Sequence, residues 1–578
     1  MPVLQPLIDL AQLCHLHGVT HAVISPGSRS AALTLAFARN PNIECQVVMD
    51  ERAAGFIALG MAQQLKKPVV LICTSGSAAY NYAPAVAEAF FQQVPLLVLT
   101  ADRPKEWIHQ NDGQTIFQTQ IYGKHAKGFW ELPADYAHPD ALWYINRSVN
   151  EALLSAQEFP YGPVHINVPI REPFYPVKNE IFQPSENIRV IRRTKTSATI
   201  DEETWRKIRV EWEGSKRILI AVGQQESSEV ISGYLRKLTE EFQIPILGDV
   251  ISNLGNGEYF ISKQDLFLSE KCYDKLRPDL LITLGKSFIS KNLKNFLRKN
   301  PAKIHWHISE NLHVIDTFHS LTDQLNVSSE YFFSKLFENE IFESFNKKDN
   351  LEKYKPYIAE WLQEERKSKQ LLDYFLTDLT TLNDITAVSF VLKNLPEGSL
   401  LHLANSMTVR YVNLLGIDIQ GVEVFCNRGT SGIDGCVSTA IGAALITKRP
   451  VYLIVGDVAF FYDRNGLLID DLPANLKIIL INNAGGTIFR MIDGPASQPE
   501  LPKYFETTHQ FNAQRTADDS NIAYFLVQDA SESSLEALND AWRNFVETKI
   551  TALLEIQTKP EYDAAVFRDL KQFIKKSN

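Results

Sequence analysis

Residues 451–486 have the sequence VYLIVGDVAFFYDRNGLLIDDLPANLKIILINNAGG. The strand-like runs Val451–Val455 and Lys477–Asn482 predict two buried β-strands, and the segment between them predicts a helix that reaches residues 467–469. A strand, a helix and a second strand in this order form a parallel βαβ unit. Ligands of such sheets bind beyond the carboxyl ends of the strands, so we expect a site where Gly456-Asp457 follows the first strand.

The same plan recurs elsewhere in the chain. Near the N-terminus, the apolar run Val69–Cys73 is followed by Thr74-Ser75-Gly76-Ser77, a helical segment and a second apolar run at 95–100. In the middle, Arg217–Gly223 and Asp279–Gly285 predict two further buried strands. We therefore predict an α/β protein with three doubly wound parallel-sheet domains.

The expected limits of these domains are 1–182, 190–345 and 370–578. A proline-rich segment at 171–176 separates the first from the second, and a charged stretch near 345–370, expected to be helical, separates the second from the third. A chain of 578 residues is also too long for one hydrophobic core, which independently predicts several domains.

The composition excludes several classes of function. The formal net charge of −10 argues against nucleic acid as a partner. No run of about 18 apolar residues occurs, so we expect no membrane insertion. The six cysteines form no CxxC pair, and the N-terminus lacks a basic leader with a cleavage site. Both features favour a cytoplasmic protein with reduced thiols.

The pair Asn482-Asn483 follows the second strand of the opening stretch. Gly-Asp, roughly 25 residues and then Asn-Asn is typical of enzymes that hold thiamine diphosphate through a divalent cation. Mg²⁺, or Mn²⁺ in its place, takes oxygen ligands, which Asp457 offers as a carboxylate, Asn483 as an amide and Gly485 as a backbone carbonyl. Gly485 and Gly486 also let the backbone approach phosphate. The alternative interpretation is a turn between strand and helix with a Gly-Asp cap. The occurrence of Gly-Asp and Asn-Asn at this spacing favours the metal site.

Two other segments point to the same cofactor. Glu51 enters an Ala/Gly-rich helix, and a carboxylic acid bonded to the cofactor's pyrimidine ring favours its imino tautomer, which takes the proton from the thiazolium C2. The alternative is helix capping by Asp50 and Glu51. Ile433, within the glycine-rich stretch 428–435, is bulky enough to support a V-shaped cofactor, although a core residue at a glycine-rich helix start is the other interpretation.

Arginines are the third informative group. Arg29, Arg103, Arg410 and Arg428 all lie at or near the predicted strand ends, where the site is expected. Arginine binds carboxylates through two parallel hydrogen bonds. Each of them alone is more often part of a surface ion pair, but their shared location indicates substrates with several carboxylates.

These residues resemble one family of thiamine diphosphate-dependent enzymes, the 2-succinyl-5-enolpyruvyl-6-hydroxy-3-cyclohexene-1-carboxylate synthases of menaquinone biosynthesis. The matching segments are SPGSRS (25–30), DERAAGF (50–56), TSGSAAYNYAPAVAEA (74–89), LTADRP (99–104), GQTI (113–116), NSMTVR (405–410), NRGTSGIDG (427–435) and GD…NNAGGTIF (456–489). They cover both ends of the chain, whereas the central region matches mainly in layout.

The resemblance implies a pyrimidine-binding, a central Rossmann-like and a diphosphate-binding domain. It implies a homodimer, or a dimer of such dimers, with the site between subunits so that Glu51 faces the partner's Asp457. The implied transferase reaction is thiamine diphosphate- and Mg²⁺-dependent decarboxylation of 2-oxoglutarate, followed by 1,4-addition of the succinyl carbanion to isochorismate. Both substrates are dicarboxylates, in agreement with the arginines.

The resemblance also assigns roles by position. Glu51 is the implied catalytic residue, and Asp457, Asn483 and the Gly485 carbonyl are the implied metal ligands. The implied cofactor contacts are Glu51, Pro26, Ser75, Gly76, Arg428, Gly432, Ile433, Gly456, Asp457, Asn483, Gly485, Gly486, Thr487 and Ile488. The implied substrate contacts are Ser406, Arg410 and Arg428 for 2-oxoglutarate, and Ser28, Arg29, Arg103, Gln114 and Lys291 for isochorismate.

The sequence departs from the family pattern at three places. Val458 replaces the last glycine of Gly-Asp-Gly, which this family tolerates. The basic pair of the central domain is reduced to Lys291-Asn292, and Gly113 stands where some members carry an amide. The last two departures concern the isochorismate pocket.

Three alternatives remain open on the sequence alone. One is another thiamine diphosphate-dependent 2-oxoacid decarboxylase or carboligase, which would not need Arg29, Arg103 and Arg410 together. Another is a non-catalytic relative that only binds the cofactor or a menaquinone metabolite, against which the intact Glu51 and Asp457 argue. The third, a nicotinamide dehydrogenase, lacks a G-x-G-x-x-G after the early strands.

Overall fold

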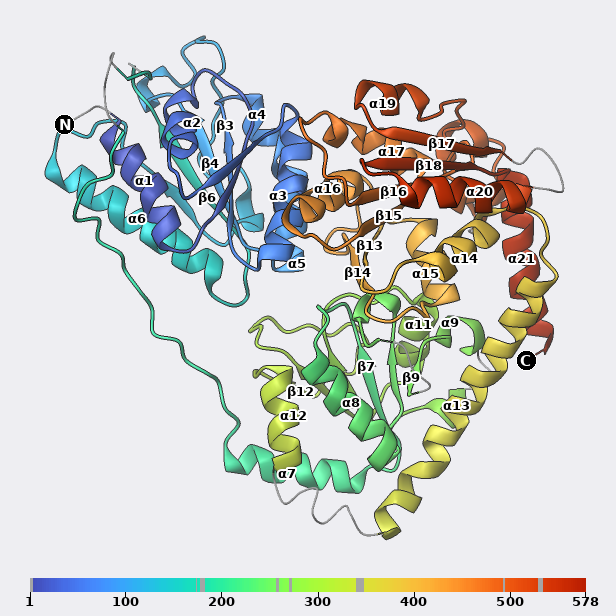
Figure 1. Ribbon diagram of the computed structural model, residues 1–578. Helices are drawn as coiled ribbons and strands as arrows, with labels where there is room; N and C mark the ends of the chain where they lie inside the picture. Colours follow the sequence, from blue (N-terminus) through green and yellow to red (C-terminus); the bar gives the residue numbers. More distant parts are fainter. Residues whose placement is uncertain are drawn as a thin grey trace.

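A computed structural model describes residues 4–172, 174–176, 182–255, 259–269, 273–338, 348–491, 494–528 and 534–577. Three units follow one another along the chain (Figure 1), each built on a six-stranded sheet in which every pairing is parallel. The predicted class, three doubly wound parallel-sheet domains, is confirmed.

The N-terminal sheet has the strand order β2-β1-β3-β4-β6-β5. Its strands are β1 (His21–Ile24), β2 (Glu44–Val47), β3 (Val69–Cys73), β4 (Leu96–Asp102), β5 (Phe129–Glu131) and β6 (Pro163–Pro169). Its helices are α1 (Gln5–Leu16), α2 (Ala31–Ala38), α3 (Glu51–Leu65), α4 (Ser77–Asn81), α5 (Ala83–Gln92) and α6 (Pro139–Gln157). The strands β3, β4 and β6 are buried along their whole length, as expected of a sheet covered on both faces.

The C-terminal sheet repeats this topology, since its order β14-β13-β15-β16-β18-β17 is the N-terminal order shifted by twelve strands. Its strands are β13 (Leu400–Leu403), β14 (Glu423–Cys426), β15 (Val451–Gly456), β16 (Leu476–Asn482), β17 (Ala523–Gln528) and β18 (Ala552–Gln557). Its helices are α14 (Asp384–Asn394), α15 (Met407–Leu415), α16 (Cys436–Ile446), α17 (Asp457–Asp463), α18 (Ile488–Met491), α19 (Gln514–Asp519), α20 (Ser534–Glu547) and α21 (Pro560–Ser577).

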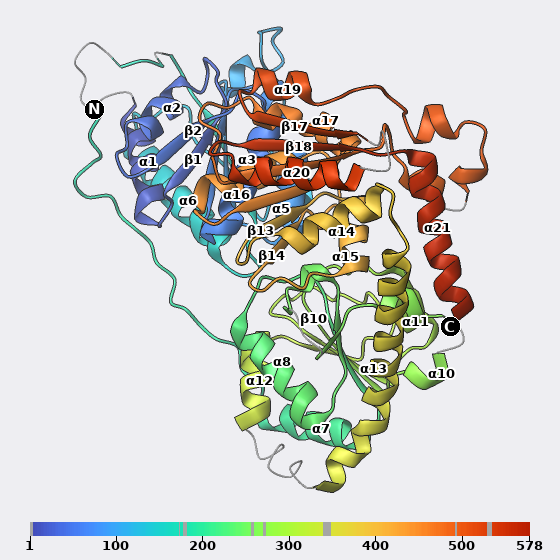
Figure 2. The ribbon, with the colours of Figure 1, turned by 45° about the vertical axis from the view of Figure 1, so that its right-hand side comes forward.

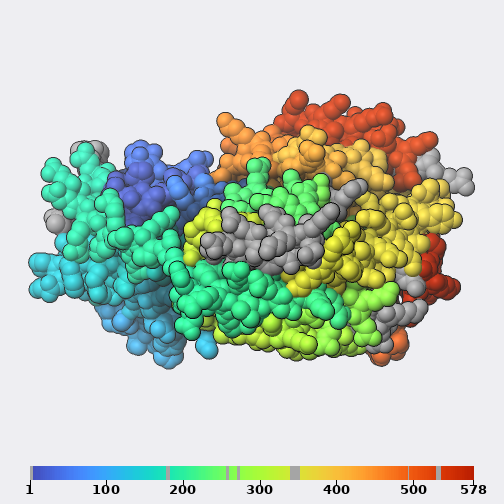
Figure 3. Space-filling view, turned by 90° about the horizontal axis from the view of Figure 1, so that it is seen from below, coloured from blue at the N-terminus to red at the C-terminus, as the bar shows by residue number. Residues whose placement is uncertain are grey.

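The central sheet has the order β12-β11-β10-β7-β8-β9, which is the Rossmann order. Its strands are β7 (Ile218–Val222), β8 (Ile246–Gly248), β9 (Phe260–Ile261), β10 (Leu280–Leu284), β11 (Ile304–Ile308) and β12 (Asp323–Leu325). Its helices are α7 (Glu202–Gly214), α8 (Glu229–Phe242), α9 (Gln264–Phe267), α10 (Tyr273–Leu276), α11 (Lys291–Lys299) and α12 (Ser329–Glu338). The long helix α13 (Lys348–Thr377) runs from this unit toward α14 (Figure 2). Seen from below, residues of all three units form the surface (Figure 3).

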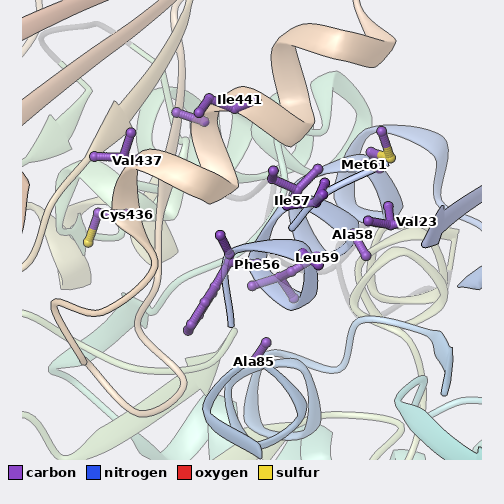
Figure 4. Packing of buried hydrophobic residues seen from close by; sticks show 14 of the residues in the cluster. Val23, Phe56, Ile57, Ala58, Leu59, Met61, Ala85, Cys436, Val437 and Ile441 are labelled. Carbon is purple, nitrogen blue, oxygen red and sulfur yellow. The ribbon is translucent and has the colours of Figure 1, made fainter. Parts of the chain in front are cut away.

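The N- and C-terminal units are joined through helices α3 and α16, which contribute to one hydrophobic core cluster (Figure 4). The two backbones touch at glycines: a Cβ on Gly60 would lie 2.0 Å from the Thr439 carbonyl oxygen, and one on Gly442 would lie 2.0 Å from that of Ile57. Glycine is therefore required at both positions, because even a Cβ atom there would force the helices apart.

Most expected elements are present. Strand β3 has the predicted bounds, and α13 covers the described part of the charged stretch. The helix expected through 467–469 is wrong: α17 ends at Asp463 and a 3₁₀ turn, Arg464–Leu467, follows. The reason is tertiary, because the buried Asp463 carboxylate accepts hydrogen bonds from the Ser438 backbone and hydroxyl, which fixes the chain direction there.

The domain limits stay predictions, and Pro173 and residues 339–347 lie outside the described residues. Cys272 also lies outside them; Cys14, Cys45, Cys73, Cys426 and Cys436 are free thiols. In the described part of the chain, no helix combines the length and the apolar character that crossing a bilayer requires.

Candidate active site

Four neighbouring strands of the C-terminal sheet, β14, β13, β15 and β16, carry predicted site residues at their carboxyl ends. Ser406 and Arg410 follow β13, and the glycine-rich segment 427–435 follows β14. Asp457 begins α17 directly after β15, and Asn483 follows β16. The sheet therefore brings together residues that are up to 77 positions apart, as the strand-end argument predicted.

Asp457 is buried and held in place by backbone donors. The Val458 N–H donates to its Oδ1 at 2.7 Å, and the Gly485 N–H donates to its Oδ2 at 2.8 Å. The Nε2 of His509 lies 3.3 Å from the same Oδ2. The Nδ1 of His509 accepts from the Phe511 N–H at 3.1 Å, which fixes the ring beside the carboxylate.

Asn483 presents one free oxygen. Its Nδ2 donates to Asp384 Oδ2 at 3.0 Å, whereas its Oδ1 is buried without a hydrogen-bond partner among the described residues. An amide oxygen in that state is what a cation ligand requires before the cation is bound. The Oγ of Thr487, four residues on, is likewise buried without a described partner.

The segment after Asn483 packs tightly on a later loop. A Cβ on Gly485 would lie 2.8 Å from the Glu506 carbonyl oxygen, which in turn accepts from the Gly486 N–H at 2.8 Å. Ala484 has φ +63°, a left-handed conformation that is uncommon outside glycine. In this segment the Gly485 N–H donates to Asp457, the Gly486 N–H to the Glu506 carbonyl and the Thr487 N–H to the Gly485 carbonyl. The Asp457 carboxylate, the unpartnered Asn483 oxygen and the second lone pair of the Gly485 carbonyl fit a divalent cation with phosphate oxygens.

Among the described residues, no group of three or more His, Cys, Asp or Glu side chains could hold a metal ion. The set of Asp457, Asn483 and the Gly485 carbonyl contains one carboxylate only. Such a mixed oxygen set with phosphate completing the shell suits Mg²⁺, which is usually bound by one or two carboxylates together with phosphates.

Positive charge gathers beside this half-site. The Arg410 guanidinium donates to the Ser406 carbonyl, and Arg428 Nη1 donates to Asn405 Oδ1 at 3.0 Å. Burial and the positive charge of Arg428 lower the pKa of Arg410, and the same two causes lower the pKa of Lys294 on α11. No described ion pair neutralises Arg410, Arg428 or Lys294. The charge of Asp265 offsets part of the pKa shift of both Arg410 and Lys294, but no carboxylate forms a described ion pair with them. A cluster of cations without ion-pair partners is suited to binding carboxylates.

Ser406 has strained backbone. Its φ of 75° and ψ of −130° lie in a region that non-glycine residues rarely adopt, at a cost of about 1–3 kcal/mol. The strain directs the chain from β13 into α15, so that Ser406 and Arg410 share the strand end. Strain of this kind is concentrated at functional sites.

Two residues that the sequence analysis missed hold the segment 427–435. Asn405 Nδ2 donates to the carbonyls of Asn427 and Gly432 at 2.7 and 2.6 Å. Glu88 of α5 is fully buried and accepts from the N–H groups of Gly429 and Thr430 at 2.7 and 2.6 Å. A glutamate of the N-terminal unit thus fixes the segment that carries Arg428 and Ile433. Ile433 itself is half-buried against the core cluster shared by both units.

The N-terminal half of the site is built around Glu51. Asp50 caps α3, with Oδ1 accepting from the Arg52 and Ala53 N–H groups at 2.9 and 3.2 Å. Capping therefore does not use Glu51, whose Oε2 accepts only from Asn81 Nδ2, at 3.3 Å, among the described residues. Glu51 lines a cavity of about 520 Å³ together with Met49, Asp50, Arg52, Asn81, Asn465 and Leu468.

Of the predicted isochorismate residues, Ser28 and Arg29 follow β1 and Arg103 follows β4, and these two strands flank β3 in the sheet. Ser28 is exposed, whereas Arg29 is 7% exposed, donates to the Ile170 carbonyl at 3.1 Å and lies 4.4 Å from the Phe174 ring centre. Arg103 pairs with Asp112 at 2.9 Å and donates to the Gly113 carbonyl.

Gln114, the last residue of that predicted set in this unit, has φ +57° and lies against Gly76, whose Cβ would be 3.3 Å from its Cα. Gly76 and Ser75 follow β3, and the Gly76 N–H donates to Gln118 at 2.9 Å. The exposed Pro26 follows β1. The N-terminal residues of the predicted site thus share one sheet edge.

Lys291 is not brought into this group by any described contact. It is exposed at the start of α11, with its neighbour Asn292 bonded to Asp265. Lys294, one turn further along the helix, is the lysine whose charge interacts with Arg428. Helical spacing alone could have suggested Lys294, because residues three apart lie on the same face.

Within one chain, Glu51 and Asp457 lie near opposite ends of α17. Asp50 and Arg52, which flank Glu51, bind Asn465 and the Tyr462 carbonyl near the C-terminal end of α17. Asp457 begins that helix, roughly 10 Å away along its axis. Near Glu51, Met49, Tyr80, Tyr462 and Leu468 are exposed. Near the metal motif, Tyr504, Phe505 and Phe511 are exposed.

Known proteins resemble the chain over its whole length. Residues 9–122 match the family described as "Thiamine pyrophosphate enzyme, N-terminal TPP binding domain", and residues 185–401 match "Middle domain of thiamine pyrophosphate"; thiamine pyrophosphate is another name for thiamine diphosphate.

Three curated relatives carry the name 2-succinyl-5-enolpyruvyl-6-hydroxy-3-cyclohexene-1-carboxylate synthase. The protein from Cytophaga hutchinsonii is 43% identical over 99% of this chain and 100% of the relative. The protein from Flavobacterium johnsoniae is 37% identical over 99% of this chain and 100% of the relative. The protein from Bacteroides fragilis is 34% identical over 97% of this chain and 98% of the relative.

Proposed function

The chain belongs to the family of 2-succinyl-5-enolpyruvyl-6-hydroxy-3-cyclohexene-1-carboxylate synthases and is a thiamine diphosphate-dependent enzyme, and from this premise we propose its substrates, metal and residue roles. The enzyme decarboxylates 2-oxoglutarate and adds the remaining succinyl unit to isochorismate, as a transferase of menaquinone biosynthesis. The observation that carries the proposal is the group of cations without described ion pairs, in which Arg410 and Arg428 lie at strand ends that also carry Asp457 and Asn483, and Lys294 of α11 lies near Arg428.

The cofactor, when bound, supplies the nucleophilic carbon that attacks a 2-oxoacid and stabilises the charge left by decarboxylation. Glu51 holds a proton at the pyrimidine nitrogen, which is general acid–base work. Its carboxylate is available for this task because Asp50 caps the helix. Gly76 and Ser75 would contact the cofactor at its pyrimidine end, and Ile433 would support it from the C-terminal unit.

Mg²⁺, or Mn²⁺ in its place, is held by Asp457, Asn483 and the Gly485 carbonyl. The support is the unpartnered Asn483 Oδ1 and the orientation of Asp457 by two backbone N–H groups. Gly486, Thr487 and Ile488 are assigned to the diphosphate, and the support is the Thr487 hydroxyl, which is buried without a partner among the described residues.

The two substrates are assigned to different halves of the site. Arg410, Arg428 and Ser406 bind the carboxylates derived from 2-oxoglutarate, since they share a sheet edge with the metal motif. Ser28, Arg29, Arg103 and Gln114 bind isochorismate from the N-terminal unit. The central unit adds cationic charge through Lys291 or, one turn on, Lys294. Asp112 pairs with the Arg103 guanidinium, so a substrate carboxylate that binds Arg103 must displace Asp112.

The functional unit is a homodimer or a dimer of dimers. Its support is the separation of Glu51 from Asp457 within the chain and the exposed apolar side chains beside each half-site, such as Met49 (64% exposed) and Phe511 (63%). A second copy that covers both patches places Glu51 opposite the partner's Asp457. A cytoplasmic location is part of the proposal, supported by the free described thiols.

Product analysis tests the reaction. The enzyme is incubated with thiamine diphosphate, Mg²⁺ and 2-oxoglutarate, with and without isochorismate, and products are identified by mass. We expect one condensation product that requires both substrates. Succinic semialdehyde as the main product in both reactions would favour the alternative, a simple 2-oxoacid decarboxylase or another carboligase.

The division of the site predicts different defects for two arginine variants. Arg410→Ala should slow CO₂ release from 2-oxoglutarate in the first turnover, whereas Arg29→Ala should leave that release intact and slow the condensation step. A buried charge-assisted contact is worth about 1.5–3 kcal/mol, so each affected step should fall about tenfold to a hundredfold. Rapid-quench measurement of CO₂ and condensation product separates the two steps. Equal slowing of CO₂ release in both variants would contradict the division.

A further inference from the structure

Asp384 is a buried carboxylate directly behind the metal motif. It is the first residue of α14, is 2% exposed, and is capped in place by Asn383, which closes a capping box with Thr386. Its carboxylate accepts three hydrogen bonds: from Asn483 Nδ2 at 3.0 Å, from Tyr411 Oη at 3.3 Å and from Thr558 Oγ1 at 2.7 Å. All three partners act as donors.

The contact with Asn483 has a directional consequence. An amide has one donor end and one acceptor end, and an ionised carboxylate accepts only. Asn483 must therefore turn its NH₂ toward Asp384, which leaves Oδ1 pointing away, buried and unpartnered. Without an acceptor at position 384, the amide could rotate and present N–H groups to a cation.

We propose that Asp384 is a positioning residue that fixes the amide of Asn483 so that its oxygen faces the divalent cation. The proposal rests on the metal site assigned above. Asp384 touches neither the cation nor a substrate, and its effect passes through Asn483. Partners of metal ligands of this kind typically change metal affinity 10- to 100-fold when removed.

A neighbouring acid provides a matched control. Asp563 of α21 is also buried, and its Oδ1 accepts from the Asp384 backbone N–H at 2.8 Å, but it makes no described contact with Asn483. Burial raises the pKa of both carboxyls, most strongly that of Asp563, which favours its neutral form. Asparagine at 563 therefore has nearly the same shape and charge as the neutral carboxyl that it replaces. The variant changes the same region but leaves the contact between Asp384 and the Asn483 amide in place.

The test measures the dissociation constant of Mg²⁺ by isothermal titration calorimetry at saturating thiamine diphosphate. Asp384→Asn replaces one acceptor oxygen by an NH₂ group, so the three donors can no longer all be satisfied. We expect Mg²⁺ to bind about 10- to 100-fold more weakly to this variant, and Asp563→Asn to stay within about twofold of the wild type. Wild-type affinity in Asp384→Asn, or equal losses in both variants, would overturn the proposal.

A double variant that exchanges the two side chains distinguishes a lost positioning contact from a general folding defect. In the double variant Asp384→Asn with Asn483→Asp, the amide at 384 donates to a carboxylate at 483, whose second oxygen faces the cation whichever way it is turned. We expect the swap to bind Mg²⁺ at least about tenfold more tightly than Asp384→Asn alone. A swap that binds no better than the single variant would contradict a positioning role, because a purely structural defect would persist.

The proposal and the metal site fail in different ways. If the metal site is wrong, the wild type shows no Mg²⁺-dependent heat, or Asp457→Ala leaves it unchanged. If only the role of Asp384 is wrong, the wild type and Asp457→Ala behave as expected while Asp384→Asn binds Mg²⁺ normally.

Discussion

Replacing Glu51 by glutamine is expected to leave thiamine diphosphate bound and to lower turnover at least about 100-fold, the range of general acid–base catalysis. The amide has the shape of the carboxylic acid but cannot supply the proton that the pyrimidine nitrogen needs. The fold should be unaffected, since Asp50 caps α3 and the Glu51 carboxylate accepts only one described hydrogen bond, at 3.3 Å.

The measurements for this variant are cofactor affinity by calorimetry and CO₂ release from 2-oxoglutarate. Asp50→Asn is the control, because asparagine caps a helix as well as aspartate does and removes a charge one residue away. We expect it to stay within a few-fold of the wild type. Near wild-type CO₂ release by Glu51→Gln would contradict the assignment of Glu51 as the catalytic acid.

Replacing Asp457 by alanine is expected to abolish Mg²⁺-dependent cofactor binding. It removes the only carboxylate of the proposed ligand set, so the loss of metal affinity should exceed the roughly 10- to 100-fold effect of losing an outer partner. It also removes the acceptor for the Gly485 N–H, a contact that holds the segment 484–487 against Asp457.

Calorimetry with Mg²⁺ and thiamine diphosphate checks this expectation, with two companion variants. Asp457→Asn keeps an acceptor for the Gly485 N–H and isolates the effect of the charge. Asp470→Ala removes an exposed carboxylate further along the same βαβ unit and should bind both ligands normally. Unchanged cofactor affinity in Asp457→Ala would place the metal elsewhere.

Local patterns predicted the elements well where burial decides them. The run Val69–Cys73 is apolar at every position, and the structure buries every one of its residues in β3. The shared location of the arginines could also be predicted, because each lies at or near a predicted strand end and parallel strands place their carboxyl ends on one edge of a sheet. The predicted end of the helix after Asp457 was wrong, because the helix ends at Asp463, whose carboxylate is bound by Ser438 of another helix.

Residues that support the site from behind could not be predicted in this way. Asp384 meets Asn483 across 99 positions, and Glu88 meets Gly429 across 341. Locally, Asp384 fits an ordinary helix start and Glu88 an ordinary helix interior, so neither differs from a structural residue in the sequence. Only the tertiary fold identifies them, since it determines which donors meet each buried carboxylate.

The central claim is that one active site combines Glu51 of one chain with the partner's Asp457. Two hybrids carrying the same two substitutions test it, each co-expressed with two different affinity tags and purified through both. In the first, one chain carries Glu51→Gln and the other Asp457→Ala, which leaves one complete site between the chains. In the second, one chain carries both substitutions and the other is wild type, which damages both sites.

The measurement is the rate of condensation product formation by each hybrid. We predict about half of the wild-type rate for the first hybrid, since one of two symmetric sites is intact, and almost none for the second. An inactive first hybrid together with a half-active second one would contradict the account, because Glu51 and Asp457 would then act within a single chain.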